Sequence, residues 1–437
     1  MKHTRILILG AGLTGLSAAF HLRGEDFALY EKEPEIGGLC RSFQIGRFTF
    51  DYTGHLLHFR KPEIREWIVE MMGENLVRHQ RKAFIYSHGV YTDYPFQANL
   101  NGLPKEVIKE CLLGYIQAEI RNSAGGTVSP RNFEEWISAT LGPGIASHFM
   151  IPFNRKLWKR ELDKMNADWV SWLIPRPKLE EVVNGALGIR NHPMGYNPTF
   201  LYPKDGGISA LGKRLSESIG PIHLNEEIEE IRTAKKVARF KSGTEISYEH
   251  LISTIPLDLC ISKCSDLPES VRLETGKLDY VTVQVVNIGI DRPAVSDKHW
   301  IYYPESKFPF YRVGCPSNLS PSMAPEGTSS LSVEISALPS EAADIKKIVN
   351  ETRQGLYSGS LLSPADPILF EEVRTISRAY VIPNHDYAST VPRLKQCLEE
   401  KEIYSIGRYG SWEHSSMEDG LFQGKTVSGR LLALCQK

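Results

Sequence analysis

The sequence predicts a mixed α/β fold in which a parallel sheet comes first, a helical segment is inserted, and an antiparallel sheet follows. Three observations support this order. Four aliphatic residues, Ile6–Leu9, end at a glycine-rich turn that leads into a helix-forming segment. Apolar residues keep helical spacing between residues 104 and 141. Between residues 280 and 380 the apolar residues recur at every second position, as in antiparallel strands.

The first stretch, Arg5–Leu16, has the pattern of a buried strand, a tight turn and a helix. Its turn carries the spacing Gly-x-Gly-x-x-Gly at Gly10, Gly12 and Gly15. We expect the first glycine to permit the turn, the second to let backbone approach a pyrophosphate, and the third to let the helix pack closely on the strand. The free N–H groups of the helix N-terminus would face the diphosphate. The stretch therefore predicts a Rossmann-like, dinucleotide-binding start.

A second short apolar strand, Phe27–Tyr30, supplies the context that this motif needs. It ends at Glu31, twenty-one residues after Gly10, where a ribose-binding carboxylate is expected. The alternative, a chance glycine-rich turn beside a surface Glu31, is disfavoured by the order of strand, turn, helix, strand and acid. The pair Gly37-Gly38 then resembles the motif of FAD-dependent amine oxidases and their relatives, rather than that of NAD dehydrogenases. The expected cofactor is therefore FAD.

The overall composition is that of an ordinary globular protein. The chain has 437 residues, enough for two or three domains, with 41% hydrophobic and 24% charged residues. A formal net charge of −1 gives no basic field for nucleic acid and no polybasic membrane signal. No apolar run approaches the roughly 20 residues that span a bilayer, and glycines interrupt the apolar start, so it is not a secretory signal. We expect no nucleic-acid partner and no membrane insertion, while nothing excludes an oligomer.

The cysteines indicate a reducing compartment. There are seven, an odd number, and they are scattered without paired spacing. Cys260 and Cys264 have no second pair or histidine at zinc spacing, so we expect buried or incidental thiols and no metal site. The expected location is cytoplasmic.

Further elements follow along the first half of the chain. Residues 48–55 alternate as a strand that leads into a glycine turn with His55 at its tip. Residues 61–72 carry the apolar stripe of an amphipathic helix, with Pro62 near its start. Residues 83–94 predict a hairpin that turns at His88-Gly89. Helices are then expected over 104–122 and 132–141, the second capped by Asn132, and they form a helical insert together with residues 143–172.

The second half is expected to complete both sheets. A helix starts at 206–211, strands at 225–231, 250–256 and 403–408 return to the first sheet, and a helix closes the chain at 420–435. The fold class is therefore α/β, with a Rossmann-like FAD-binding domain, a helical insert and an antiparallel β-sheet domain. The expected bounds are 1–60, 203–265 and 395–437 for the FAD-binding domain, 98–190 for the insert, and 61–97, 191–202 and 266–394 for the sheet domain.

Five short segments carry a resemblance to a known family: Tyr94–Gln97, Pro152–Trp158, Asn197–Phe200, Pro309–Arg312 and Gly407–Trp412. In order and approximate spacing they resemble UDP-galactopyranose mutases, particularly the eukaryotic type, over nearly the whole chain. Members of that family use reduced FAD to interconvert the pyranose and furanose forms of UDP-galactose. Flavin N5 attacks the anomeric carbon, and a covalent flavin–sugar intermediate lets the ring open and reclose. The resemblance implies an isomerase of a nucleotide sugar, with NADPH or NADH as the reductant.

The resemblance also implies residue roles for the nucleotide. Tyr94 and Gln97 match the uridine-contacting motif, and Asn154 and Trp158 match the adjoining part of that pocket. Core packing is the alternative for Trp158. Arg312 matches an arginine that grips the diphosphate, where a planar guanidinium offers paired hydrogen bonds. A surface salt bridge is the alternative for this arginine.

Other matches lie near the flavin and the sugar. Tyr302 and Tyr380 match tyrosines near the flavin and diphosphate, Arg81 matches an arginine near the diphosphate and sugar, and Asn197 matches an asparagine near the sugar. His55 matches a histidine beside the isoalloxazine, with a structural turn histidine as the alternative. The catalytic positions that the resemblance implies are His55, Arg312, Tyr302 and Tyr380. The cofactor-binding positions are Gly10, Gly12, Thr14, Gly15, Glu31, Gly37, Gly38, Leu39 and Arg408, and the substrate-binding positions are Arg81, Tyr94, Gln97, Asn154, Trp158, Asn197 and His414.

Four positions depart from the family pattern. His58 replaces an aromatic residue, and Leu173 stands where a second diphosphate arginine is expected, although Arg176 is close enough to substitute. His414 replaces a tyrosine and Glu418 an asparagine. Losing an arginine and a tyrosine while placing a carboxylate nearby should weaken or reshape recognition of the standard substrate. We therefore expect an altered nucleotide-sugar preference as readily as UDP-galactopyranose itself.

Two other functions stay open from the sequence. An amine-oxidase-like or desaturase-like FAD oxidoreductase would keep the glycine motifs and Glu31 but would give no reason for the segments Tyr94–Gln97 and Asn154–Trp158. The third hypothesis is a flavin- or nucleotide-binding protein without catalysis, which the departures at Leu173 and His414 suggest.

Overall fold

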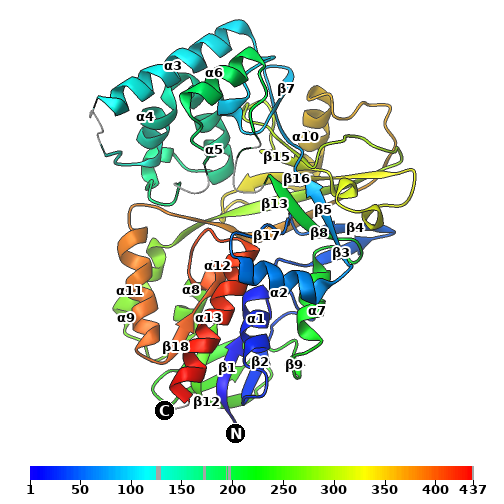
Figure 1. Cartoon of the computed structure of the whole chain (residues 1–437). Coiled ribbons are helices and arrows are strands. Elements are labelled where there is room, and N and C mark those ends of the chain that lie inside the picture. The colour runs from blue at the N-terminus through cyan, green and yellow to red at the C-terminus, as the bar shows by residue number, and fades with distance from the viewer. Residues whose placement is uncertain (125–128, 171–173, 193, 195–197, 436–437) are drawn as a thin grey trace.

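The computed structural model describes residues 1–124, 129–170, 174–192, 194 and 198–435 (Figure 1). In this part of the chain, two seven-stranded sheets organise the fold. The expected α/β class with a parallel first sheet, a helical insert and an antiparallel second sheet is confirmed. No helix among the described residues is both long enough and apolar enough to cross a bilayer.

The first sheet is built around the N-terminal strand β1 (Lys2–Leu9), which is aliphatic because both of its faces are covered. Its neighbours β2 (Phe27–Tyr30) and β12 (Glu245–Ser253) run parallel to it. The remaining strands are β9 (Ile222–His223) beside β2, β18 (Ile403–Ser405) beside β12, and the antiparallel extension of β10 (Ile228–Arg232) and β11 (Val237–Phe240).

Helices cover both faces of this sheet, as in a doubly wound fold (Figure 1). One face packs on α1 (Leu13–His21), α2 (Pro62–Met72), α7 (Ser209–Ser216) and α13 (Met417–Cys435). The other face packs on α8 (Leu257–Lys263) and α11 (Tyr387–Glu399), with α9 (Glu269–Glu274) beside them.

Two elements pack differently from the expected domain bounds. The helix α2 was assigned to the sheet domain, whereas its residues Ile64, Ile68 and Met72 belong to the core beneath the first sheet. The same holds for the first turns of α11, where Val391 and Leu394 pack under the first sheet. An amphipathic stripe predicts a helix but not the sheet on which that helix packs.

The second sheet is antiparallel except for one parallel pair, β14 with β6. Its strand order is β17 (Ile368–Ile382), β13 (Asp279–Ile290), β16 (Ser329–Ala337), β15 (Arg312–Gly314), β14 (Trp300–Tyr302), β6 (Ala83–Ser87) and β7 (Val90–Asp93). The helix α10 (Ile345–Ser358) packs on it. Two small ribbons, β3 (Ser42–Ile45) with β4 (Phe48–Asp51) and β5 (Leu76–Gln80) with β8 (Thr199–Pro203), complete the strands.

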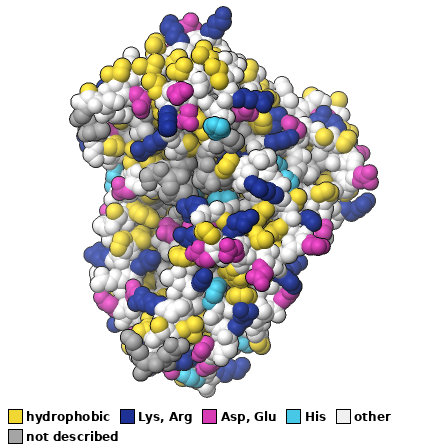
Figure 2. Space-filling model, in the orientation of Figure 1, with side chains coloured by type: hydrophobic (Ala, Val, Ile, Leu, Met, Phe, Trp, Pro, Cys, Tyr) yellow, Lys and Arg dark blue, Asp and Glu magenta, His cyan; other side chains and the backbone are white. Residues whose placement is uncertain are grey.

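The helical insert contains α3 (Lys105–Ser123), α4 (Phe133–Ile145), α5 (Ile151–Trp158) and α6 (Leu179–Leu187) around one apolar core. As predicted, the Asn132 side chain caps α4 by accepting a hydrogen bond from the Glu135 N–H at 2.9 Å. The predicted hairpin turn is also confirmed, since His88 and Gly89 have φ angles of 53° and 80°. On the face seen in Figure 2, acidic and basic side chains are intermixed, in keeping with a net charge near zero.

Candidate functional site

The N-terminal glycine turn has the geometry that its sequence predicts. Gly10 has a φ of +99°, and a Cβ added there would lie 2.4 Å from the Thr254 hydroxyl oxygen. A Cβ on Gly15 would lie 1.9 Å from the carbonyl oxygen of Gly10. Both positions therefore require glycine, the first for its conformation and the second for the close packing of α1 on the turn.

The two glycine motifs meet in space. The Gly37 N–H donates to the Ala11 carbonyl at 2.7 Å, and Gly12 and Gly37 pair as an isolated parallel bridge. A Cβ on Gly38 would come within 3.2 Å of the Gly12 Cα. Gly12 is also the N-cap of α1 and caps it without a side-chain hydrogen bond. The result is a side-chain-free backbone surface beside the N-terminus of a helix, which suits a pyrophosphate.

The side chain of Glu31 supports the glycine backbone surface through hydrogen bonds. Its carboxylate is buried and accepts the Ala11 N–H at 2.7 Å on one oxygen and the Glu33 N–H at 3.0 Å on the other. Each oxygen keeps a lone pair that a ribose hydroxyl could use. The predicted ribose contact stays a prediction, and the turn-bracing role of the carboxylate was not foreseen from the sequence.

Thr14, on α1, lies against the C-terminal part of the chain. A Cβ on Gly407 or on Gly420 would approach the Thr14 hydroxyl to 2.8 Å, and one on Gly424 would approach the Thr14 carbonyl to 2.5 Å. Three glycines thus let α12 (Gly407–Gly410) and α13 pack directly on α1. This contact places Arg408 next to the glycine cradle.

Arg408 is the centre of a cluster with Tyr380, His414 and His55. Its guanidinium lies 5.3 Å from the Tyr380 ring centroid, and its Nη2 donates to His414 Nδ1 at 3.4 Å. The imidazole of His414 stacks on Tyr380 with centroids 5.9 Å apart and an interplanar angle of 18°. The Nε of Arg408 is buried and has no hydrogen-bond partner within the described part of the chain.

Both histidines of this cluster are neutral at physiological pH. Burial, with the nearby charges of Arg408 and Arg312, lowers the pKa of His414 to about 3. Burial likewise lowers the pKa of His55 to about 4, although its Nδ1–H donates to the Thr53 carbonyl at 2.9 Å. The buried guanidinium of Arg408, whose Nε has no hydrogen-bond partner in the described residues, beside two uncharged imidazoles suits an electron-rich or anionic ligand. Together with the glycine cradle, these residues fit a flavin dinucleotide.

Leu39 joins this region through packing. It lies in a small apolar cluster with Tyr52, Phe153, Tyr311 and Tyr380. The predicted flavin neighbours Leu39 and Arg408 thus come from opposite ends of the chain and meet beside Tyr380.

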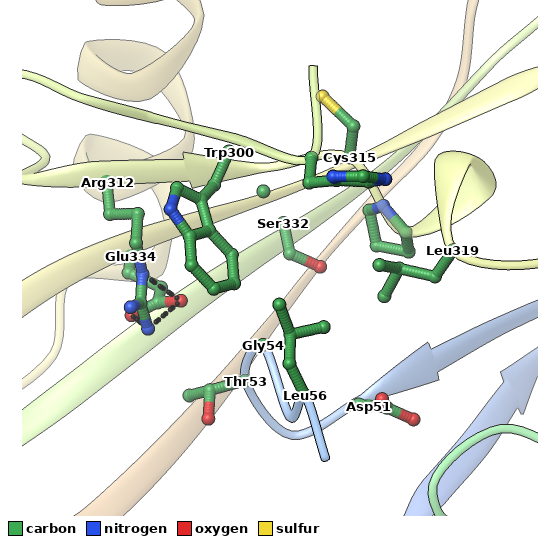
Figure 3. A pocket seen from close by; sticks show the side chains of 13 residues that line it. Asp51, Thr53, Gly54, Leu56, Trp300, Arg312, Cys315, Leu319, Ser332 and Glu334 are labelled. Atoms are coloured by element: carbon green, nitrogen blue, oxygen red, sulfur yellow. Dashed lines mark hydrogen bonds and ion pairs between the residues drawn. The ribbon is translucent and has the colours of Figure 1, made fainter. Parts of the chain in front are cut away.

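Arg312 forms a buried ion pair rather than the surface salt bridge considered above. On β15, its Nε and Nη2 donate to the carboxylate of Glu334 on β16 at 2.8 to 3.0 Å (Figure 3). The Arg312 side chain is 15% exposed and that of Glu334 is 2% exposed. The Tyr311 hydroxyl donates to the same carboxylate at 2.5 Å, and burial beside this charge raises the pKa of Tyr311. The guanidinium is therefore fixed in orientation.

Tyr302, Tyr94 and Arg81 gather next to this ion pair. Tyr302 on β14 is directly opposite Arg312 in the strand register. Its ring lies 5.5 Å from that of Tyr94, and the Arg81 guanidinium lies 4.7 Å from the Tyr94 ring centroid. Arg81 Nη2 also donates to the Met194 carbonyl at 3.3 Å. The structure thus brings together Arg81, Tyr302 and Arg312, which match the diphosphate region, and the predicted uridine contact Tyr94.

The predicted nucleoside contacts are buried, and their polar atoms bond within the protein. Trp158 is 2% exposed, its indole N–H donates to Asn154 Oδ1 at 3.1 Å, and Asn154 Nδ2 donates to the Met150 carbonyl at 2.8 Å. Gln97 Nε2 donates to the Pro175 carbonyl at 2.6 Å. Trp158 is therefore packed in the core, as the alternative to nucleotide contact expected. Its ring also lies 6.0 Å from that of Tyr380, at the edge of the Arg408 cluster.

A narrow cavity adjoins the Arg312–Glu334 pair (Figure 3). It holds about 20 Å³, room for about one water molecule, between residues 51–56 and the strands β14 to β16. Asp51 at its edge accepts hydrogen bonds from the hydroxyls of Ser42 at 2.6 Å and Tyr202 at 2.7 Å. Burial raises the pKa of Asp51 to about 6. Sequence reasoning missed both Asp51 and Glu334. The latter could have been flagged as a carboxylate on the same strand face as Ser332 and Ser336.

The departures from the family pattern are partly explained. Glu418 is 1% exposed, and its carboxylate accepts the backbone N–H groups of Arg60 at 2.7 Å and Lys61 at 2.6 Å. The carboxylate is thus held by the segment that enters α2, and its expected effect on phosphate recognition stays a prediction. Arg176 lies 4.9 Å over the Trp136 ring in the helical insert. Leu173 and Asn197 lie outside the described residues.

The titratable side chains offer no metal centre in the described part of the chain, where no group of three or more His, Cys, Asp or Glu could hold an ion.

His58, the remaining departure from the family pattern, donates from Nδ1 to the Leu56 carbonyl at 3.2 Å. The described cysteines, Cys40, Cys111, Cys260, Cys264, Cys315 and Cys397, are free thiols.

Known proteins share this architecture. The fold superposes on the crystal structure of a reduced UDP-galactopyranose mutase with a TM-score of 0.92 and 28% identity, over 99% of this chain and 96% of that chain. Among curated proteins, a Baeyer-Villiger monooxygenase of Streptomyces coelicolor is 24% identical over 155 residues, 34% of this chain and 30% of that protein. The 4,4'-diapophytoene desaturase of Staphylococcus aureus is 28% identical over 92 residues, 20% of this chain and 18% of that protein. The matches thus span less than a third of either curated relative.

The structural similarity confirms the resemblance to UDP-galactopyranose mutases. The profile of one wider family, described as flavin-containing amine oxidoreductase, matches residues 13–432, nearly the whole sequence. The chain therefore belongs to the flavin-containing amine oxidoreductase family.

Proposed function

We propose that this protein is a flavin-dependent nucleotide-sugar mutase that interconverts the pyranose and furanose forms of UDP-galactose or a related nucleotide sugar. One observation carries the proposal: the oriented Arg312 with Tyr302 lies within electrostatic range of Tyr380 and His414, which cluster with Arg408. The charge of Arg312 helps to lower the pKa of His414, and Tyr380 acts electrostatically on Tyr302. An anion grip therefore adjoins the flavin-binding region, on a fold that resembles a reduced mutase.

When bound and reduced, the flavin supplies the nucleophile for this chemistry, so no nucleophilic side chain is required. The chain's own residues bind and orient the substrate. Arg312, fixed by Glu334, directs its remaining N–H donors to the diphosphate, and the Tyr302 and Tyr380 hydroxyls donate further hydrogen bonds to it. The neutral His414 and His55 add hydrogen-bonding capacity without adding charge.

The surroundings of the reaction belong to the same proposal. NADPH or NADH reduces the FAD, and the protein works in the cytoplasm, which the free cysteines support. The division into an FAD-binding domain, a helical insert and a sheet domain also stays a proposal. The packing of α2 favours extending the first of these to residue 72.

The test is turnover under reducing conditions. The purified protein is reduced with dithionite or NADPH and supplied with UDP-galactofuranose and related nucleotide sugars, and pyranose formation is followed by chromatography. The oxidised protein serves as the control and is expected to be inactive. Failure of the reduced protein to convert any nucleotide sugar would refute the proposal.

Membership of the amine oxidoreductase family supports one alternative, an amine-oxidase-like FAD oxidoreductase. It would release stoichiometric hydrogen peroxide with an amine substrate. It leaves the buried pair of Arg312 and Glu334 beside Tyr302 without a role, because an amine brings no anionic group for an arginine to bind.

A further inference from the structure

Lys156 occupies an unusual place for a lysine. It lies on α5 between Asn154 and Trp158, and its ammonium donates to three main-chain carbonyls, those of Tyr303 at 2.7 Å, Glu305 at 2.6 Å and Phe310 at 3.0 Å. An ammonium has three N–H donors, so all of them are used. Because the acceptors belong to the backbone, they are present whatever side chains the segment 303–310 carries.

The segment that Lys156 holds connects two candidate site residues. Residues 303–311 join β14, which ends at Tyr302, to β15, which begins at Arg312. The Tyr303 N–H donates to the Tyr311 carbonyl at 2.9 Å, which closes the base of this hairpin connection. Two of the three carbonyls that bind Lys156 lie within two residues of Tyr302 or Arg312, so the ammonium fixes the base of the hairpin rather than its tip.

The other side of the junction is α5 itself. This helix carries Asn154 and Trp158, which match the nucleoside end of the site and bond to each other. Apolar contacts also join α5 to the hairpin, since the Phe153 ring meets that of Tyr302 edge-on at 5.5 Å. Such contacts allow sliding, whereas three charge-assisted hydrogen bonds define one position.

Burying this ammonium is unfavourable, and burial lowers the pKa of Lys156 to about 7, against the opposing effect of Glu305. A methionine of similar length would fill the same space without that cost. The charge is therefore not explained by packing alone, and the positional constraint is what it supplies.

We propose that Lys156 is a positioning residue that fixes helix α5 against the Tyr302–Arg312 hairpin and thereby sets the spacing between the nucleoside half and the diphosphate half of the nucleotide site. The identity of the ligand rests on the proposed function. A ligand that spans both halves gains affinity only when the halves keep the correct separation, whereas a ligand that occupies one half does not depend on it.

The experiment compares three ligands on the FAD-loaded protein: UDP, uridine and inorganic pyrophosphate, by calorimetry or ligand-observed NMR. In Lys156→Met the Kd for UDP should rise at least tenfold, while those for uridine and pyrophosphate stay within about twofold of wild type. Lys156→Arg, which keeps the charge and its donors, should recover most of the UDP affinity. Lys298→Met is the matched control, because Lys298 is also largely buried but bonds to Asp297, away from α5.

Two results would overturn the inference: unchanged UDP affinity in Lys156→Met, or parallel weakening of all three ligands, which a general loss of structure would cause. If Lys156→Met does not fold, Lys156→Gln, which keeps two N–H donors, is judged by the same comparison. Wild-type protein that binds UDP but converts no nucleotide sugar would refute the proposed mutase function and leave this comparison valid. Wild-type protein that does not bind UDP would overturn this inference, whereas the turnover assay with other nucleotide sugars would still decide the mutase function.

Discussion

Replacing Arg312 by alanine should destabilise the protein through the carboxylate that it leaves behind. In the native structure, Glu334 is bound through both oxygens by Arg312, and the Tyr311 hydroxyl is the other side-chain donor to it. With the side chain of Glu334 only 2% exposed and room for about one water molecule in the adjoining cavity, water replaces the lost guanidinium only in part. Removing one member of a buried ion pair typically costs about 3–5 kcal/mol. We expect a loss near the lower limit, about 3 kcal/mol, because the tyrosine hydrogen bond remains.

The double variant Arg312→Ala/Glu334→Gln isolates this cause. Glutamine keeps the size and an acceptor for Tyr311 but carries no charge, so at least half of the lost stability should return. UDP affinity should not return, because the anion-binding guanidinium is absent from both variants. Stability is measured by urea denaturation of the FAD-loaded protein, and affinity by titration with UDP. Wild-type stability in Arg312→Ala, or a double variant no more stable than the single one, would refute the reasoning.

Three further predictions follow from the same geometry. Gly10→Ala should abolish flavin retention, measured by absorbance of the purified protein, because of its φ of +99° and the 2.4 Å approach to Thr254, whereas Gly220→Ala, with no atom within 4 Å, should retain it. Glu418→Gln should lower the free energy of unfolding by about 1–3 kcal/mol, because it weakens the acceptor for the Arg60 and Lys61 N–H groups. UDP affinity should not change. Tighter UDP binding would show that the carboxylate does oppose the phosphates. The folded-state pKa of His414, about 3, lies below its ordinary value of 6.5, so its contribution to stability is present above pH 6.5 and is lost as the pH falls towards 3. His414→Phe should therefore lose about 2–3 kcal/mol less than wild type between pH 7 and pH 4.5, measured by denaturation at both values; an identical loss would place the titration elsewhere.

The parts of the fold that were predicted correctly are those that short sequence patterns determine. The glycine turn at Gly10, the hairpin at His88-Gly89 and the cap at Asn132 each depend on a few consecutive residues and their backbone preferences. The packing of α2 could not be predicted in the same way. Its stripe of Ile64 and Ile68 requires an apolar partner, but either sheet would satisfy that requirement.

In the candidate site, too, the sequence indicated which residues matter but not the partners that they contact. The resemblance singled out Arg312, Tyr302 and Arg408, and the structure pairs Tyr302 with Arg312 across two strands and places Arg408 beside Tyr380. The resemblance gave no role to Glu334 or Lys156, because their roles depend on partners that folding supplies from distant segments. Glu418 illustrates the converse, since its charge was noticed but its backbone partners at Arg60 and Lys61 lie more than 350 residues away.

The contact between α1 and α13 has a consequence for biosynthesis. The hydroxyl of Ser17 donates to the Leu421 carbonyl at 2.6 Å across a separation of 404 residues, and three C-terminal glycines enclose Thr14. At about 5–20 residues per second, the ribosome delivers this partner on the order of 20–80 s after α1 has emerged. The part of α1 that packs on α13 lacks this partner during that interval. The packing around the glycine cradle is thus completed only after α13 has been synthesised.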